Sequence, residues 1–194
     1  MNLQDRIINH FSDSIQTQQE AMLSLCELIE YASQQLVSAL LNDKKILTCG
    51  NGRSATSAQL FSSAMLNQFE RDRPSLPVIA LNTDSATITG IANDYHFDEV
   101  YAKQLRALGQ SGDILLTYSD GKHSSNIAKA ITTAHDKELL VIALTGNNGG
   151  MIAPLLYETD IEIRIPSSSN ARIQEVHVLI THCLCDLIDH QLFG

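Results

Sequence analysis

Two short loops in this sequence combine glycine with hydroxyl side chains, the residue types that hold phosphate groups. The first loop, Gly50 to Ser54, reads Gly-Asn-Gly-Arg-Ser. Its glycines let backbone N–H groups approach an anion, and a following helix N-terminus would add partial positive charge. Ser54 could cap that helix and donate to a phosphate oxygen. The loop is neither a P-loop nor a dinucleotide fingerprint, because the required lysine and third glycine are missing. An anion site and a ligand-free tight turn are both compatible with it.

The second loop runs from Ser119 to Ser124 and has a hydroxyl at each end. Asp120 brings a negative charge to the place where a phosphate would sit, which opposes anion binding unless Lys122 points inward. A surface turn with Ser124 as the helix N-cap is the other interpretation of these residues.

Both loops lie between a short apolar run and a helical pattern. We expect strands at residues 45–49, 77–81, 113–118, 139–145 and 161–165, and helices at residues 54–69, 84–93, 98–108, 124–135 and 171–192. Apolar strands that alternate with helices predict an α/β fold, a five-stranded parallel sheet with helices on both faces, in a three-layer sandwich. Ligands of such sheets bind beyond the carboxyl ends of the strands. The loops at 50–54, 119–124 and 146–150 are expected there.

Residues 1–43 form a long N-terminal segment with helical spacing of apolar residues and no Gly or Pro. About forty helical residues would span roughly 60 Å, more than a compact domain of this size. We therefore expect a break near Gln16–Glu20 and packing of the excess apolar surface against another subunit. The chain 1–194 is interpreted as a single domain whose first 43 residues serve oligomerisation.

Composition narrows the class of protein further. Of the 194 residues, 44% are hydrophobic and 18% charged, which predicts a folded domain, and the net charge is −9. Duplex DNA binding normally requires a basic face, so proteins or small molecules are the expected partners and direct DNA binding is not expected. The 4 Cys form no C-x-x-C pair and are expected to be reduced. No leader-like or membrane-spanning run is visible, so the expected location is the cytoplasm and no membrane partner is expected.

The two loops, in this order, resemble the SIS (sugar isomerase) family, and phosphoheptose isomerases in particular. The resemblance extends over essentially the whole chain. Its motifs are Cys49-Gly50-Asn51-Gly52-x-Ser54, Ala92-Asn93-Asp94, Gly112-Asp113-Ile114-Leu115-Leu116, Ala143-Leu144-Thr145-Gly146 and Ala171-Arg172-Ile173-Gln174-Glu175-x-His177. It implies an SIS-type fold and a phosphosugar cleft formed by Asn51, Gly52, Ser54, Asn93, Asp94, Ser119, Ser124, Gln174 and His182.

This sequence departs from the isomerase pattern where the family places its zinc site and acid/base pair. The family's His-x-x-x-Glu falls on Leu60 and Ala64, while its Gln and later His fall on Gln174 and His182. Leucine and alanine neither ligate zinc nor move a proton, and two neutral ligands are too few for a stable site. The departure predicts a non-catalytic protein with no metal and no cofactor.

The sequence resembles the DiaA branch of the family more closely. DiaA proteins also lack the catalytic carboxylate, and they share the stretches Ser14–Gln18 and Cys183–Asp189 and the pair Leu192 and Phe193. This resemblance implies a homotetramer that binds the initiator DnaA and promotes its assembly at the replication origin, with Leu192 and Phe193 in the contact. The residues alone favour packing of this apolar pair within the oligomer.

Two alternatives remain open at this point. The chain could be an active phosphoheptose isomerase acting on sedoheptulose 7-phosphate, which would need a base other than residue 64. It could also be a phosphosugar-sensing module that binds its ligand without turnover. An SIS-type transcription regulator is disfavoured, because no basic helical module precedes residue 43.

Overall fold

The computed structural model describes residues 2–121 and 124–194, and its centre is a parallel sheet of five strands. The strand order is β2-β1-β3-β4-β5, and every neighbouring pair is parallel. The strands are β1 Ile46–Gly50, β2 Val78–Ala80, β3 Ile114–Tyr118, β4 Leu140–Gly146 and β5 Ile161–Ile165. The predicted parallel sheet is confirmed. Its inner strands are buried on both faces, which explains their continuous apolar character.

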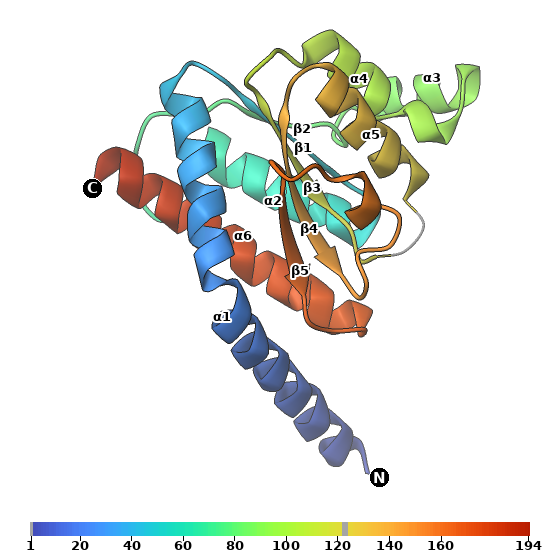
Figure 1. Cartoon of the computed structure of the whole chain (residues 1–194). Helices are drawn as coiled ribbons and strands as arrows, with labels where there is room; N and C mark the ends of the chain where they lie inside the picture. The colour runs from blue at the N-terminus through green and yellow to red at the C-terminus, as the bar shows by residue number, and fades with distance from the viewer. Residues whose placement is uncertain (1, 122–123) are drawn as a thin grey trace.

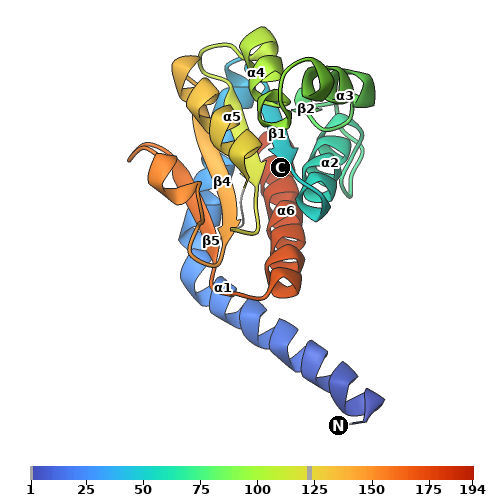
Figure 2. The same cartoon turned by 90° about the vertical axis from the view of Figure 1, so that its right-hand side faces the viewer.

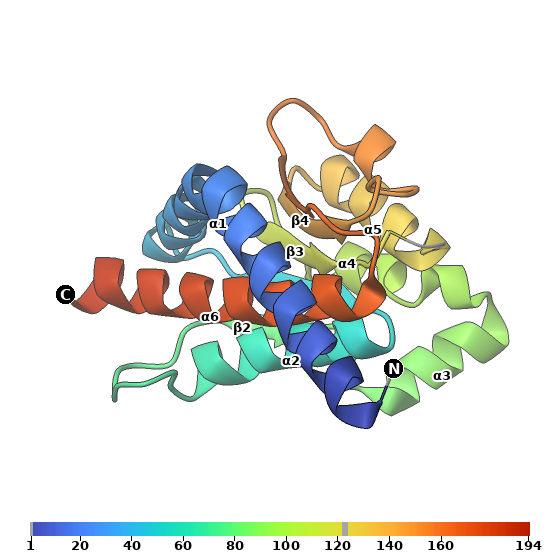
Figure 3. The same cartoon turned by 90° about the horizontal axis from the view of Figure 1, so that it is seen from below.

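Helices cover both faces of the sheet. They are α1 Leu3–Leu41, α2 Arg53–Leu66, α3 Ser85–Asp94, α4 Ala102–Leu108, α5 Ser125–Asp136 and α6 Asn170–Phe193, with short 3-10 turns η1 Phe97–Glu99 and η2 Ala153–Leu155. Figures 1 and 3 show α1, α2 and α6 on one side of the sheet and α4 and α5 on the other. Alternate strand residues separate two cores: Ile46 and Leu116 pack under α1, α2 and α6, whereas Leu47 and Leu115 pack under α4 and α5. The predicted three-layer sandwich is confirmed.

The N-terminal helix α1 is one continuous helix of 39 residues, so the expected break near Gln16–Glu20 is wrong. No Gly or Pro interrupts its hydrogen bonding, and α6 supports it just before the point where the break was expected. There the guanidinium of Arg172 donates to the carbonyl of His10, and Ser14 Oγ donates to Glu175 Oε2 over 2.7 Å. The helix therefore does not turn back, and its N-terminal part projects from the domain (Figure 1).

Residues 3–16 of α1, called the arm below, extend beyond the body of the domain (Figures 1 and 2). The first buried residue of the helix is Thr17. Large apolar side chains of the arm are more than half exposed, namely Leu3, Ile7, Ile8, Phe11 and Ile15. Within the part of the chain that the structure describes, none of the helices combines the length and apolar character of a membrane span.

The connectivity brings three helix N-termini to one edge of the sheet. β1 leads into α2, β3 leads into α5, and β5 leads into α6. Because all five strands are parallel, these junctions lie at their shared carboxyl ends. This edge is therefore the place where the phosphate-type loops meet.

Candidate functional site

A cleft of about 280 Å³ lies at the carboxyl ends of β1 and β3. It is lined by Asn51, Gly52, Arg53, Ser54, Tyr118, Ser119, Asp120, Ser124 and Gln174. The structure thus brings together six residues predicted for the phosphosugar cleft: Asn51, Gly52, Ser54, Ser119, Ser124 and Gln174. Arg53, Tyr118 and Asp120 were not predicted as ligand residues, although their places within or beside the two loops could have indicated them.

The first loop turns into α2 at Gly52, which is the N-cap and has a φ of 54°. This left-handed conformation suits glycine and rarely suits other residues. The helix therefore begins earlier than expected, and the predicted capping role of Ser54 is wrong because Ser54 already lies within the first turn. Its hydroxyl accepts a hydrogen bond from Gln174 Nε2 over 3.0 Å, which joins α2 to α6 inside the cleft.

The second loop presents two buried hydroxyls. Ser119 Oγ and Ser124 Oγ lie 3.4 Å apart, and Ser124 stands at the N-cap position of α5 without forming a side-chain cap. An amide pair fixes the two loops together, because Asn51 and Asn126 exchange hydrogen bonds of 2.7 and 2.8 Å. Lys122 and His123 of this loop lie outside the described residues, so the proposed inward position of Lys122 stays a prediction.

Most of the charges around the cleft attract an anion, and the charge of one described residue repels it. The N-termini of α2 and α5 direct partial positive charge into it, and the guanidinium of Arg53 adds a full positive charge. The carboxylate of Asp120 lines the same cavity. A phosphate placed between the serines would therefore be attracted by two helices and Arg53 and repelled by Asp120.

A buried histidine lies one turn beyond Gln174 on α6. Burial lowers the pKa of His177 to about 4, against the opposing effects of its hydrogen bond to the Thr145 carbonyl and of the charge on Asp120. His177 Nε2 lies 3.1 Å from that carbonyl oxygen and must donate to it, and the low pKa leaves the imidazole neutral at neutral pH. Burial also raises the pKa of Tyr118, whose hydroxyl is hydrogen-bonded to Thr181. Neither group serves as a base at neutral pH.

Three predicted ligand residues lie outside the cleft. Asn93 and Asp94 form the exposed end of α3, where Asn93 Nδ2 donates to Asp94 Oδ1 over 3.0 Å. The half-buried His182 lies eight residues beyond Gln174, which is about 12 Å along a helix axis. Its ring contacts Phe69, with 5.6 Å between the ring centroids. The loop at 146–150 does not line the cavity either.

The zinc that the family resemblance implies does not fit this chain. Leu60 and Ala64 on α2 are aliphatic, so α2 offers no ligand at either position on its side of the seam between α2 and α6. Nowhere in residues 2–121 and 124–194 do three His, Cys, Asp or Glu side chains gather in a way that could hold a metal ion. No catalytic step is therefore assigned to a metal.

The C-terminal pair Leu192 and Phe193 is half-buried and held by the body of the domain. Leu192 packs against the core beneath α1, α2 and α6. Arg71 lies over the Phe193 ring at 6.0 Å and donates to the carbonyls of Phe193 and Gly194 over 3.1 and 2.7 Å. These contacts anchor the end of α6.

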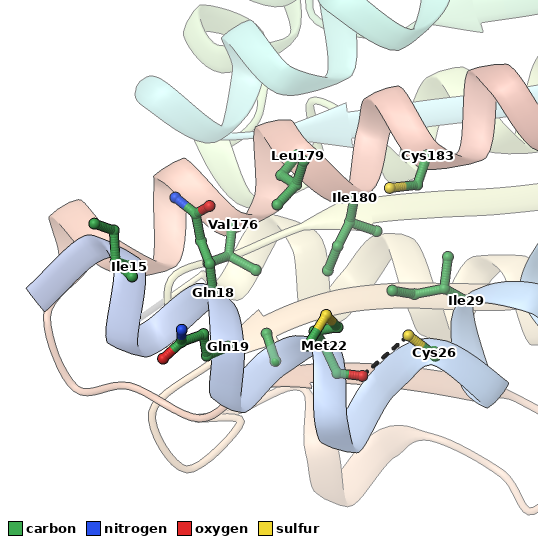
Figure 4. A pocket seen from close by; sticks show the side chains of 11 residues that line it. Ile15, Gln18, Gln19, Met22, Cys26, Ile29, Val176, Leu179, Ile180 and Cys183 are labelled. Carbon is green, nitrogen blue, oxygen red and sulfur yellow. Dashed lines mark hydrogen bonds between the residues drawn. The ribbon is translucent and has the colours of Figure 1, made fainter. Parts of the chain in front are cut away.

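A second hollow, of about 350 Å³, lies between α1 and α6 (Figure 4). It is lined by Ile15, Gln18, Gln19, Ala21, Met22, Cys26, Ile29, Val176, Leu179, Ile180 and Cys183. Apart from two amides and two thiols, these side chains are apolar. This hollow, called the α1–α6 groove below, offers no acid/base pair and is suited to a protein surface.

Comparison with known proteins gives matches over the full length. A model described as the SIS domain matches residues 10–146. A phosphoheptose isomerase of Methylococcus capsulatus is 58% identical over 194 residues, and the match covers 100% of both chains. A phosphoheptose isomerase of Chromohalobacter salexigens is 56% identical, with all of this chain and 98% of the relative covered. The solved structure of a phosphoheptose isomerase from Francisella tularensis matches with a TM-score of 0.93 at 46% identity, covering 98% of this chain and 100% of that one.

These matches overturn the prediction of a non-catalytic, DnaA-binding protein. Relatives that are more than half identical from end to end are named as enzymes. That prediction depends on two positions, Leu60 and Ala64. Those side chains still cannot move a proton, but they do not exclude a proton carrier elsewhere in the site.

Proposed function

Because this chain belongs to the SIS domain family, we propose that it is a phosphosugar isomerase of the phosphoheptose isomerase type, with sedoheptulose 7-phosphate as its substrate. The observation that carries the proposal is the anion-suited cleft at the sheet edge, in a chain that matches named phosphoheptose isomerases from end to end. The inferred reaction is an aldose–ketose isomerisation.

The phosphate group is assigned to the two loops. The hydroxyls of Ser54, Ser119 and Ser124 can donate to its oxygens, and the N-termini of α2 and α5 stabilise its charge. Arg53 compensates for the nearby Asp120. This arrangement supports a phosphorylated substrate over a neutral sugar.

The sugar chain is assigned to the stretch of α6 between Gln174 and His182, beside α2. Gln174 lies next to the phosphate loops, and His182 lies about 12 Å further along α6. Leu60 on the facing helix is half-buried and apolar, which limits water near the reacting carbons. An extended seven-carbon chain held at its phosphate end would thus direct its carbonyl end toward His182.

His182 is the proposed proton carrier, because an imidazole nitrogen can accept a proton and return it. It takes a proton from C1 of the ketose, and the C–H electron pair becomes the C1=C2 bond as O2 gains a proton. Return of the proton to C2 and loss of the O1 proton then give the aldose. The sum is one proton moved from C1 to C2 and one from O1 to O2, with no oxidant or reductant.

The test is to incubate the protein with sedoheptulose 7-phosphate in D₂O and follow aldose formation and deuterium incorporation at C1 and C2. We expect turnover by the wild type and a loss of at least about 10²-fold in His182→Asn. His190→Asn changes an exposed histidine on the same helix and should retain activity. If the wild type is stabilised by the phosphosugar but gives neither product nor exchange, the protein binds without turnover and the isomerase proposal is wrong.

We also infer that copies of the chain assemble through α1 and α6, as a homotetramer. The projecting arm exposes large apolar side chains, and the α1–α6 groove at its base is lined mostly by apolar groups. A second copy offers both features again, so the arm and groove of neighbouring subunits can cover one another.

A further inference from the structure

The segment from Asn67 to Pro77, which joins α2 to β2 and is called the strap below, runs beside the C-terminal half of α6 (Figure 3). Three residues of the strap contact that helix. Phe69 contacts His182, Arg73 pairs with Asp189, and Arg71 binds the carbonyls of Phe193 and Gly194. The strap is therefore held against α6 at three places.

Arg73 is the buried anchor of the strap. Its side chain is 1% exposed, and Nε donates to Asp189 Oδ1 over 2.8 Å. The other guanidinium nitrogens donate to the carbonyls of Met65 and Ala64 near the end of α2, over 2.6 and 2.8 Å. A single cation thereby joins the strap to both helices that border the seam. The strap is fixed at this point and cannot shift without exposing a buried ion pair.

Phe69 lies four residues before this anchor and reaches back to the seam. Its ring is half-buried, packs against the core under α1, α2 and α6, and meets the His182 ring at 5.6 Å with 36° between the planes. A side chain packed against a fixed ring loses rotamer freedom. The orientation of the His182 imidazole is therefore limited by an aromatic ring that does not itself face the phosphate cleft.

We propose that Phe69 is a positioning residue for proton transfer by His182, and that the strap holds it in place. The inference rests on the proposed function, in which His182 carries the proton. Small errors in the placement of a reacting group can lower rates by about 10²-fold. The phosphate loops are remote from Phe69, so substrate affinity should not depend on its ring.

The test compares Phe69→Leu, which retains bulk but loses the ring, with Phe69→Tyr, which retains the ring. We expect Phe69→Leu to lower kcat by about 10- to 100-fold with KM unchanged, and Phe69→Tyr to remain near the wild type. Arg71→Gln loosens the strap without altering the ring and should cause a smaller loss of kcat. Phe97→Leu, at an exposed phenylalanine on η1, is the matched control and should have no effect.

A second readout does not require turnover. The rate at which diethyl pyrocarbonate acylates His182, measured by mass spectrometry, should rise several-fold in Phe69→Leu and not in Phe97→Leu. If Phe69→Leu keeps the wild-type kcat and acylation rate, the inference is wrong. If the wild type has no isomerase activity but the acylation rate responds as expected, the proposed function fails while the Phe69–His182 contact stands. If Phe69→Leu does not fold, the test passes to Arg71→Gln, in which kcat and the acylation rate of His182 are measured. Wild-type values of both in Arg71→Gln would overturn the role of the strap.

Discussion

The two hollows on either side of α6 differ in the groups that they leave available. Among the described residues, the cleft at the sheet edge presents hydroxyls, amides, the guanidinium of Arg53 and the carboxylate of Asp120, and α6 contributes Gln174 to it. The α1–α6 groove presents mainly aliphatic side chains, and α6 contributes Val176, Leu179 and Ile180 to it. Polar groups without intrahelical partners suit a small anion, whereas an apolar surface suits another helix. One helix thus carries two recognition surfaces, separated by residues that the core buries.

This arrangement makes the two surfaces separable by substitution. A change on one face of α6 should affect one surface only. A change that loosens the seating of the helix should affect both.

The largest expected effect is on assembly. Leu179→Glu places a charge in the α1–α6 groove, where burial against a second copy would cost several kcal/mol. We expect the molar mass from size-exclusion chromatography with light scattering to fall, while phosphosugar binding persists. Leu108→Glu, on a similarly exposed leucine of α4, is the control and should keep the wild-type mass. An unchanged mass for Leu179→Glu would show that this groove is not a subunit interface.

The next effect is on stability. Arg73→Met leaves Asp189, which is 5% exposed, as a buried charge without its partner. The free energy of unfolding should drop by about 3–5 kcal/mol, measured by urea denaturation. Arg106→Met breaks the exposed pair with Glu99 and should cost less than about 1 kcal/mol. Equal losses in the two variants would contradict the anchoring role of Arg73.

A third effect depends on pH. Because burial lowers the pKa of His177 to about 4 from an ordinary value of 6.5, the unfolded chain binds a proton first as the pH falls. The folded state should therefore lose up to about 3 kcal/mol between pH 6.5 and pH 4, and nothing from this group above pH 6.5. His177→Gln should flatten this part of the stability profile, whereas His190→Gln, at an exposed position, should leave its slope unchanged. The measurement is urea unfolding at pH 7.0 and pH 4.5. A wild-type slope in His177→Gln would rule out this histidine as the cause.

The smallest expected effect is on ligand affinity. Ser54→Ala removes one donor to the phosphate and should weaken binding of sedoheptulose 7-phosphate by about 10- to 100-fold, measured by calorimetry. The mass of the assembly should not change. Ser63→Ala, at an exposed serine of the same helix, provides the comparison. Wild-type affinity in Ser54→Ala would place the phosphate elsewhere.

The sequence by itself determined the sheet, the helices and the edge at which ligands bind. Continuous apolar runs such as Ile114–Tyr118 are required by burial on both faces, and a parallel sheet places the loops after β1 and β3 side by side. Five of the nine predicted ligand residues meet in one cleft for this reason, and Gln174 joins them from α6. Asn93 and Asp94 do not, because the path of α3 depends on packing that local spacing does not encode.

Only the tertiary structure decided how the helices are joined. The bonds between Ser54 and Gln174 and between Arg73 and Asp189 link residues more than a hundred positions apart, and so does the bond from Arg172 of α6 to the carbonyl of His10 in α1. Local periodicity predicts which face of a helix is apolar, but not which other helix or strand that face packs against. Such contacts form only when the packed layers bring distant side chains within bonding distance.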